Sequence, residues 1–313
     1  MKKIINRYCW IIFIFAFNFS AGAIDEENFY REFLWNEVIN APAESQVQVA
    51  LVLSGGGARG LAHIGVLKVL EEEGVPIKII TGTSVGAIIG ALYSSGISPD
   101  KMETLAKEIG WQDMADLSTP NILKLFLADR LLPTTNMEKY LRKYLDEKYF
   151  HELPIKFACV ATDLLTGEKI IFREGEIVPA VRASATIPGV FEPVQYRQRL
   201  LVDGGLVSNI PSFEARLLGA EMIIAVVTAS DFSRQDVRNV FQVLTQAIYI
   251  QGKVIDSQSL ALCDIVIYPA VSDVGIADFL RQADCIQAGI EATRKEIIGI
   301  KEKIIDCYLR KSR

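Results

Sequence analysis

The sequence predicts a three-layer α/β/α sandwich with a mainly parallel central sheet. Two observations carry this prediction. Short apolar runs rich in β-formers alternate with helical patterns, which is typical of βαβ units. The chain also has 313 residues, of which 50% are hydrophobic and 23% charged, enough for a large core and too apolar for a disordered chain. No repeat or interdomain linker interrupts residues 47–313, so we expect one domain there.

The first 23 residues have the pattern of a secretory signal peptide. Lys2, Lys3 and Arg7 precede an apolar run at 8–19, and three small residues end at Ala23. A positive start, an apolar centre and a small-residue cleavage site define such a leader. The alternative is a membrane anchor, for which the run is short because a spanning helix needs about 20 apolar residues. We therefore expect cleavage after Ala23 and export to the periplasm or the medium.

The charge balance limits the choice of partners. The leader holds three of the 33 basic residues and none of the 38 acidic ones, so the remainder has a net charge of −8 rather than −5. Nucleic-acid binders usually carry a basic patch, and we expect no nucleic-acid partner. Contact with a membrane surface would be transient and would depend on apolar residues. The cysteines are widely spaced, without the spacing of metal ligands, so we expect no metal site.

The first elements follow from apolar periodicity. Residues 24–46 are polar and mixed, with a helix expected at 26–38 and a linker after it. Residues 47–53 form a β-rich run that ends in three glycines. Apolar residues at helical spacing then predict a helix over 61–73, which Gly74 ends.

The next elements repeat this order. An apolar run at 77–81 predicts a second strand, and small residues at 85–93 predict a helix after a sharp turn. We expect further helices at 99–109, 137–145, 236–260 and 277–309, and further strands at 156–162, 169–173, 200–203, 222–228 and 264–268.

The glycine-rich turn after the first strand has two interpretations. Its sequence, GGGARG at 55–60, matches the GxGxxG pattern of dinucleotide-binding loops. That function needs an acidic residue near the end of the next strand to hold the ribose, and residues 77–81 contain none. The glycines can instead direct backbone N–H groups into one cavity.

The second motif, GTSVG at 82–86, lies between a strand and a small-residue helix. That context is the one a nucleophile elbow requires: Gly82 and Gly86 allow a tight turn from which the Ser84 hydroxyl projects. Ser84 also precedes a helix N-terminus, whose dipole favours developing negative charge. The alternative is an ordinary strand–turn–helix connection.

A serine nucleophile needs an oxyanion hole. Backbone N–H groups of Gly55, Gly56 and Gly57 can supply it, since in a parallel sheet both loops emerge at the same carboxyl edge. Arg59 would lie beside this loop. It could anchor the loop, attract an anionic headgroup, or act as a helix-capping or ion-paired residue.

The nucleophile also needs a base, and neither histidine of the mature chain suits that role. His63 precedes the serine and is expected to support the loop, while His151 lies in a polar connection and is expected at the surface. Asp203 ends an apolar strand and is followed by Gly204 and Gly205. A partly desolvated carboxylate can act as a base, although a single Asp-Gly is also a common turn. We expect this strand to end at the same kind of edge as the other motifs.

Together these motifs resemble the patatin-like phospholipase family. GGGARG, GTSVG and DGG occur in the family's order, and residues 183–194 and 209–211 also look like family segments. The resemblance covers residues 48–230. It implies a patatin-like fold and a lipid acyl hydrolase of the phospholipase A or lysophospholipase type, without metal or cofactor. It also implies a Ser84–Asp203 dyad, with Gly56 and Gly57 the best oxyanion donors. The remaining motif residues would support these groups: Arg59, Gly60, Gly82, Gly86, Gly204 and Gly205.

Three questions stay open at this point. The same dyad could serve a thioesterase or an acyltransferase, and a chain with this fold could bind lipid without catalysis. Residues 111–132 are apolar and could form a core helix, a cap over an acyl-chain pocket or an interfacial patch. Ser184 is expected to position the loop near Asp203 rather than to react.

Overall fold

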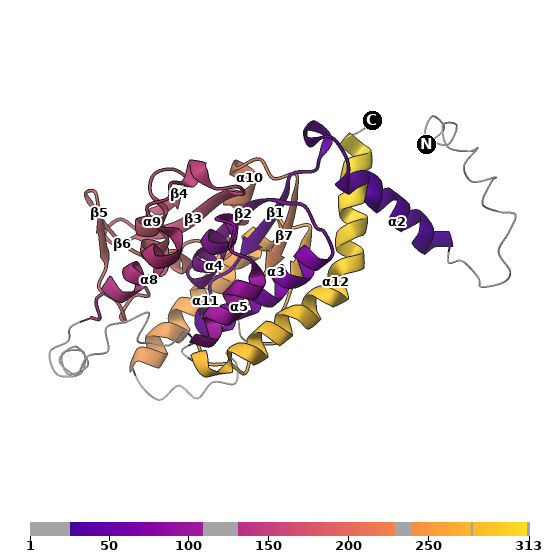
Figure 1. Cartoon of the computed structure of the whole chain (residues 1–313). Helices are drawn as coiled ribbons and strands as arrows, with labels where there is room; N and C mark the ends of the chain where they lie inside the picture. The colour runs from indigo at the N-terminus through magenta and orange to yellow at the C-terminus, as the bar shows by residue number, and fades with distance from the viewer. Residues whose placement is uncertain (1–25, 109–130, 229–239, 277, 312–313) are drawn as a thin grey trace, which may run out of the picture.

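The computed structural model describes residues 26–108, 131–228, 240–276 and 278–311 (Figure 1). Their centre is an eight-stranded sheet of order β5-β6-β3-β2-β1-β7-β8, with β4 also paired to β3. The strands are β1 (Val49–Leu53), β2 (Ile77–Thr83), β3 (Lys156–Asp163), β4 (Lys169–Phe172), β5 (Val194–Tyr196), β6 (Arg199–Asp203), β7 (Met222–Val226) and β8 (Ile265–Ile267).

The sheet is parallel from β3 through β2, β1 and β7 to β8. Strands β4 and β6 pair antiparallel with β3, and β5 pairs antiparallel with β6. The predicted α/β/α sandwich is thus confirmed, with a mixed sheet. The short strand β5 is absent from the sequence-based prediction because, unlike β8, its three residues (VQY) do not form an apolar run.

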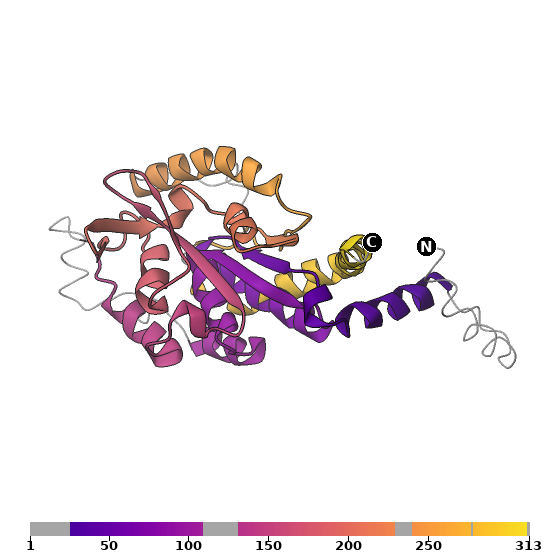
Figure 2. The ribbon, with the colours of Figure 1, turned by 90° about the horizontal axis from the view of Figure 1, so that it is seen from above.

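Helices cover both faces of the sheet (Figure 2). One face carries α3 (Ala62–Glu72), α4 (Val85–Ser94), α5 (Pro99–Glu108), α8 (Thr135–Leu145), α9 (Ile177–Ser184) and α12 (Gln282–Lys311). The other face carries α10 (Ser212–Leu217) and α11 (Val240–Leu260). The last helix starts five residues later than predicted, after a 3-10 turn at Phe279–Arg281.

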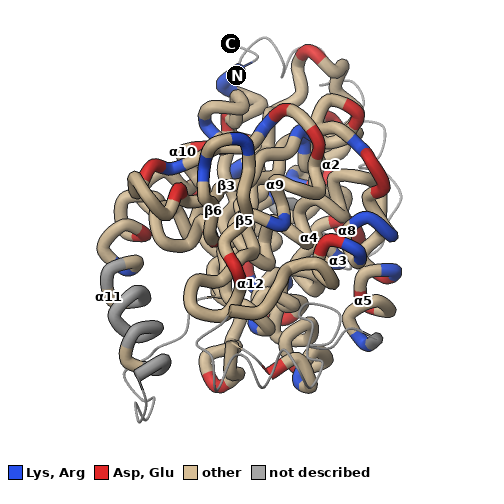
Figure 3. Tube along the Cα trace, turned by 90° about the vertical axis from the view of Figure 1, so that its left-hand side faces the viewer, with Lys and Arg blue, Asp and Glu red and all other residues tan. Residues whose placement is uncertain are grey.

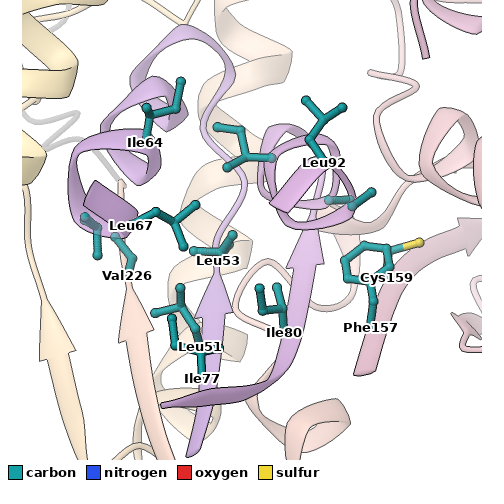
Figure 4. Packing of buried hydrophobic residues seen from close by; sticks show 14 of the residues in the cluster. Leu51, Leu53, Ile64, Leu67, Ile77, Ile80, Leu92, Phe157, Cys159 and Val226 are labelled. Carbon is teal, nitrogen blue, oxygen red and sulfur yellow. The ribbon is translucent and has the colours of Figure 1, made fainter. Parts of the chain in front are cut away.

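The core explains why the central strands read as unbroken apolar runs. Leu51 and Leu53 of β1 pack with Ile64 and Leu67 of α3 (Figure 4). Residues at the alternate positions, such as Val52, belong to a second cluster on the α10 face. All five residues of β1 are buried, as expected for a parallel strand covered by helices on both sides.

The N-terminal helix α2 (Glu26–Ile39) lies against α12, as Figure 1 shows. Trp35 is buried there, with the Lys301 ammonium 5.3 Å from its ring centroid, and Arg31 pairs with Glu302 at 3.0 Å. The predicted leader, residues 1–23, lies outside the described residues. In the described part of the chain, no helix is long and apolar enough to cross a membrane.

Candidate active site

Ser84 occupies the sharp turn between β2 and α4. Its backbone angles are φ 56° and ψ −127°, a conformation that non-glycine residues rarely adopt and that costs on the order of 1–3 kcal/mol. The turn closes only because its two flanking glycines lack side chains. A Cβ on Gly82 would overlap the Gly86 carbonyl, and a Cβ on Gly86 would overlap the Leu53 carbonyl. The turn therefore has the strained geometry of a nucleophile elbow.

Ser184 supports this strained turn. The Ser84 N–H donates to the Ser184 Oγ at 3.1 Å, and Ser184 is fully buried at the end of α9. The hydroxyl thus satisfies a backbone donor that has left both the strand ladder and the helix. Its partner is thus the Ser84 turn, whereas the sequence led us to expect that Ser184 positions the loop near Asp203.

Asp203 reaches Ser84 because two strands meet head to head along β3. Cys159 and Val160 of β3 pair with β2 on one side and β4 on the other. Ala161 and Thr162 pair with β4 and β6, so β6 lies on the same side of β3 as β2. Strand β2 ends at Thr83 opposite Val160, and β6 ends at Asp203 opposite Ala161.

This arrangement also shows the direction of the Asp203 strand, which the sequence left open. Asp203 was expected at the edge where the parallel strands end, and it does lie there. Strand β6 arrives from beyond that edge, however, running antiparallel to β3. The two carboxyl-terminal ends therefore point at each other, which puts the residue after β2 beside the last residue of β6.

The Asp203 carboxyl is desolvated and shares a hydrogen bond with Ser84. Burial raises its pKa from 3.8 to about 6, and hydrogen bonds from the Ser84 hydroxyl and the Gly205 N–H partly offset that rise. The Gly205 N–H lies 2.8 Å from the Asp203 Oδ1. Gly204 fits against the Val160 carbonyl, where a Cβ would overlap that oxygen. Both glycines thus allow the close approach that the carboxyl needs.

The glycine loop lies next to Ser84. A Cβ on Gly55 would lie 3.3 Å from the Ser84 Cβ, and Gly57, at φ 58°, leaves no room for a Cβ beside the Ile276 carbonyl. The Gly55 N–H donates to the Asn209 carbonyl at 3.3 Å and the Ala58 N–H to that of Ile276 at 2.9 Å. The Gly55 N–H is therefore engaged elsewhere, whereas the next two N–H groups have no acceptor among the described residues.

Arg59 anchors this loop. Its side chain is 1% exposed and its Nε donates to the Val274 carbonyl at 2.6 Å. Of the roles open at the sequence level, this contact favours loop anchoring, and a side chain buried this deeply does not meet a headgroup at the surface. Gly60 packs against Val85 at the start of α4, where a Cβ would overlap the valine side chain.

Neither histidine lies in a position to activate Ser84. His63 is fully buried, and its Nε2 donates to the Ser54 carbonyl at 2.9 Å. Burial lowers the pKa of His63 to about 4, so the ring is neutral and supports the loop, as predicted. His151 is exposed before the first residue of β3, at the sheet edge opposite Ser84.

An apolar cavity, partly open to solvent, lies beside Ser84. Its walls come mainly from α4, α5 and α8 and include Ile88, Leu92, Met102 and Met137. None of the described lining residues is charged. Such a cavity suits a hydrocarbon chain whose carbonyl end lies at the serine.

Ion pairs connect α8, which lines this cavity, to α9 and to the residue before it. Glu138 of α8 pairs with Arg142 at 3.2 Å and with Arg182 of α9, and Arg142 also pairs with Glu176 at 2.7 Å. Figure 3 shows acidic and basic residues next to one another along α8. Of the segment 111–132, only the last two residues are described. Leu132 is buried and its N–H donates to the Val190 carbonyl at 2.9 Å.

Comparison with known families assigns the chain to one of them. A family model described as patatin-like phospholipase matches residues 51–216, which include the glycine loop, the elbow and the aspartate. The chain belongs to the patatin-like phospholipase family.

Several patatin-like relatives are similar over the same region. The chain is 35% identical over 185 residues to human patatin-like phospholipase domain-containing protein 6, covering 58% of this chain and 13% of that protein. It is 37% identical over 182 residues to an uncharacterized NTE family protein of Mycobacterium tuberculosis, covering 58% and 49%. The chain thus spans half or less of these relatives.

The structure of VipD from Legionella pneumophila shares the patatin-like fold. It matches 84% of this chain and 67% of its own length, with a TM-score of 0.50 and 16% sequence identity. At that identity the likeness concerns the fold alone.

Asn209 lies between the motifs, and no role for it was predicted from the sequence. The Asn209 Oδ1 lies 2.6 Å from the place of a Cβ on Gly55 and 3.5 Å from that of a Cβ on Gly205. It therefore fills the space between the glycine loop and the turn after Asp203. The feature of the sequence that could have indicated this role is its position, six residues after Asp203. Among the described residues, no cluster of His, Cys, Asp or Glu could hold a metal ion.

Proposed function

We propose that the protein is a serine acyl hydrolase that cleaves lipid esters of the phospholipase A or lysophospholipase type. The observation that carries this proposal is the hydrogen bond between Ser84 and Asp203, with Ser84 itself lining an uncharged cavity. A hydroxyl on a strained turn, a carboxyl with a raised pKa and a hydrocarbon-lined space are what ester hydrolysis of a lipid requires.

In the proposed mechanism Asp203 takes the proton from the Ser84 Oγ as that oxygen attacks the acyl carbonyl. The N–H groups of Gly56 and Gly57 stabilise the oxyanion, and the alcohol or lysolipid leaves after accepting the proton from Asp203. Water activated by the same carboxylate then releases the fatty acid from Ser84. A base with a pKa of about 6 is ionised at neutral pH and remains basic enough to accept a proton.

The same residues would serve a thioesterase or an acyltransferase. Which acceptor is used depends on groups at the cavity mouth, so product analysis by mass spectrometry after incubation with a mixed lipid extract distinguishes the three reactions. We further propose that the protein is exported and meets its lipid at a membrane surface, on the strength of the leader pattern at residues 1–23.

Covalent labelling tests the proposal directly. A fluorophosphonate probe should modify the wild-type chain at Ser84 and leave Ser84→Ala unmodified, and that variant should not hydrolyse a p-nitrophenyl ester. A folded wild-type protein that neither reacts with the probe nor releases fatty acid would be a lipid-binding protein instead.

A further inference from the structure

Two buried hydroxyl groups hold the carbonyl of Gly55. The Thr228 Oγ1 donates to this oxygen at 2.9 Å and the Ser54 Oγ at 3.0 Å. Both residues are completely buried, and neither lines the cavity beside Ser84. The carbonyl therefore points into the protein, between the ends of β1 and β7.

The two hydroxyls are themselves fixed by the sheet. The Thr228 N–H donates to the Ser54 Oγ at 3.0 Å, and the two hydroxyl oxygens lie 3.3 Å apart. The Ser54 N–H continues the β1–β7 ladder to the Val226 carbonyl at 3.1 Å, while His63 holds the Ser54 carbonyl. A Cβ on Gly56 would overlap the Thr228 Oγ1, so the loop lies directly against this pair.

The bonds to the Gly55 carbonyl also fix the direction of the Gly56 N–H, because the peptide that joins the two residues is planar and trans. The carbonyl of Gly55 and the N–H of Gly56 belong to one peptide unit and point in opposite directions. Since the carbonyl faces Thr228, the Gly56 N–H faces away from it, and no described residue accepts a hydrogen bond from it. Rotation of this peptide would turn the N–H out of position and would break both hydroxyl bonds.

We propose that Ser54 and Thr228 are positioning residues that aim the Gly56 N–H at the oxyanion formed on Ser84. This inference rests on the proposed function and adds to it residues that lie outside the three motifs. Thr228 follows β7, which is remote in sequence from the glycine loop, and it acts on the donor through one peptide plane.

The test compares four variants of the full chain with the wild type. Thr228→Val removes the hydroxyl at nearly constant shape, Thr228→Ser restores it, and Ser54→Ala removes the second donor. Thr293→Val is the matched control, because Thr293 is also fully buried and its hydroxyl also donates to a backbone carbonyl, that of Gly289 at 2.8 Å. The readouts are kcat and KM for a p-nitrophenyl ester.

Two inhibitors separate positioning from general damage to the fold. An alkyl trifluoromethyl ketone forms a tetrahedral adduct with an oxyanion, whereas the alkyl alcohol of the same length only fills the cavity. Loss of a whole oxyanion donor typically costs 10²–10³ in rate, so a loosened donor in Thr228→Val should lower kcat about 10-fold with KM within about 2-fold. Ketone affinity should fall by the same factor and alcohol affinity should not change.

The remaining variants complete the comparison. Thr228→Ser should stay within about 3-fold of the wild-type kcat and Ser54→Ala should show a loss like that of Thr228→Val, while Thr293→Val should behave as wild type. A wild-type kcat in Thr228→Val, or an equal loss of ketone and alcohol binding, overturns the inference. If Thr228→Val does not fold, Ser54→Ala decides by the same criteria. An inactive wild-type protein would instead overturn the proposed function.

Discussion

Replacing Asp203 by Asn should abolish hydrolysis and yet stabilise the fold at alkaline pH. Burial raises the pKa of Asp203 from 3.8 to about 6, and each unit corresponds to about 1.4 kcal/mol. Between these pH values the folded chain keeps a proton that the unfolded chain has lost. Stability therefore falls as the pH rises through this window. Above pH 6 the ionised carboxylate costs the fold on the order of 3 kcal/mol.

Urea unfolding of the wild type and Asp203→Asn at pH 4 and pH 8 measures this cost. The variant should be more stable at pH 8 by about 1–3 kcal/mol, the lower value allowing for weaker hydrogen bonds to an amide. At pH 4 most of the difference should vanish. Asp163→Asn is a control of opposite sign: despite burial, hydrogen bonds from the Leu165 N–H and Arg199 lower the pKa of Asp163, so that variant should lose stability at pH 8.

The result that refutes this reasoning is equally clear. If Asp203→Asn differed from the wild type by the same amount at both pH values, the carboxyl would not be desolvated as described. Retained ester hydrolysis in this variant would remove Asp203 from the role of base, whatever its effect on stability.

Four further outcomes are expected. The kcat/KM of the wild type should rise with pH to a plateau around the pKa of Asp203, about 6, and a flat profile from pH 5 to pH 8 would contradict an aspartate base. His63→Gln should keep measurable turnover, since the neutral ring only donates to the Ser54 carbonyl; a loss as complete as that of Ser84→Ala would implicate the imidazole. Gly86→Ala should lower the free energy of unfolding by about 3 kcal/mol or more, whereas Gly252→Ala, at a half-buried position of α11 with no atom near its Cβ position, should raise it by up to about 1 kcal/mol. Ala106→Phe, in the cavity wall, should shift the preferred p-nitrophenyl ester from long to short acyl chains.

Much of the fold could be predicted because its signals are local. The central strands are buried on both faces, so each reads as a short apolar run, and the helices between them show their own period. The elbow was also predictable, since Gly82 and Gly86 are required by contacts within a few residues and with the adjacent strand. The direction of β6 was not, because a five-residue apolar run is the same whether it pairs parallel or antiparallel.

The roles of single side chains were likewise predictable where they depend on nearby residues and not where they depend on distant ones. His63 was predicted to support the loop because it lies one turn into the helix that follows. Arg59 had several interpretations, and only its burial against Val274, more than 200 residues away, selects anchoring. The sequence around residue 55 does not indicate that Asn209 and Thr228 contact the glycine loop.

The amino-acid sequence alone determined the strand–turn–helix units, the strained serine turn and the membership of the three motifs in one site. Those features depend on residue type and on spacing over a few positions. Only the tertiary structure decided how the carboxyl meets the hydroxyl. That meeting depends on two strands ending against the same side of β3, and strand pairing is a property of segments far apart in the chain.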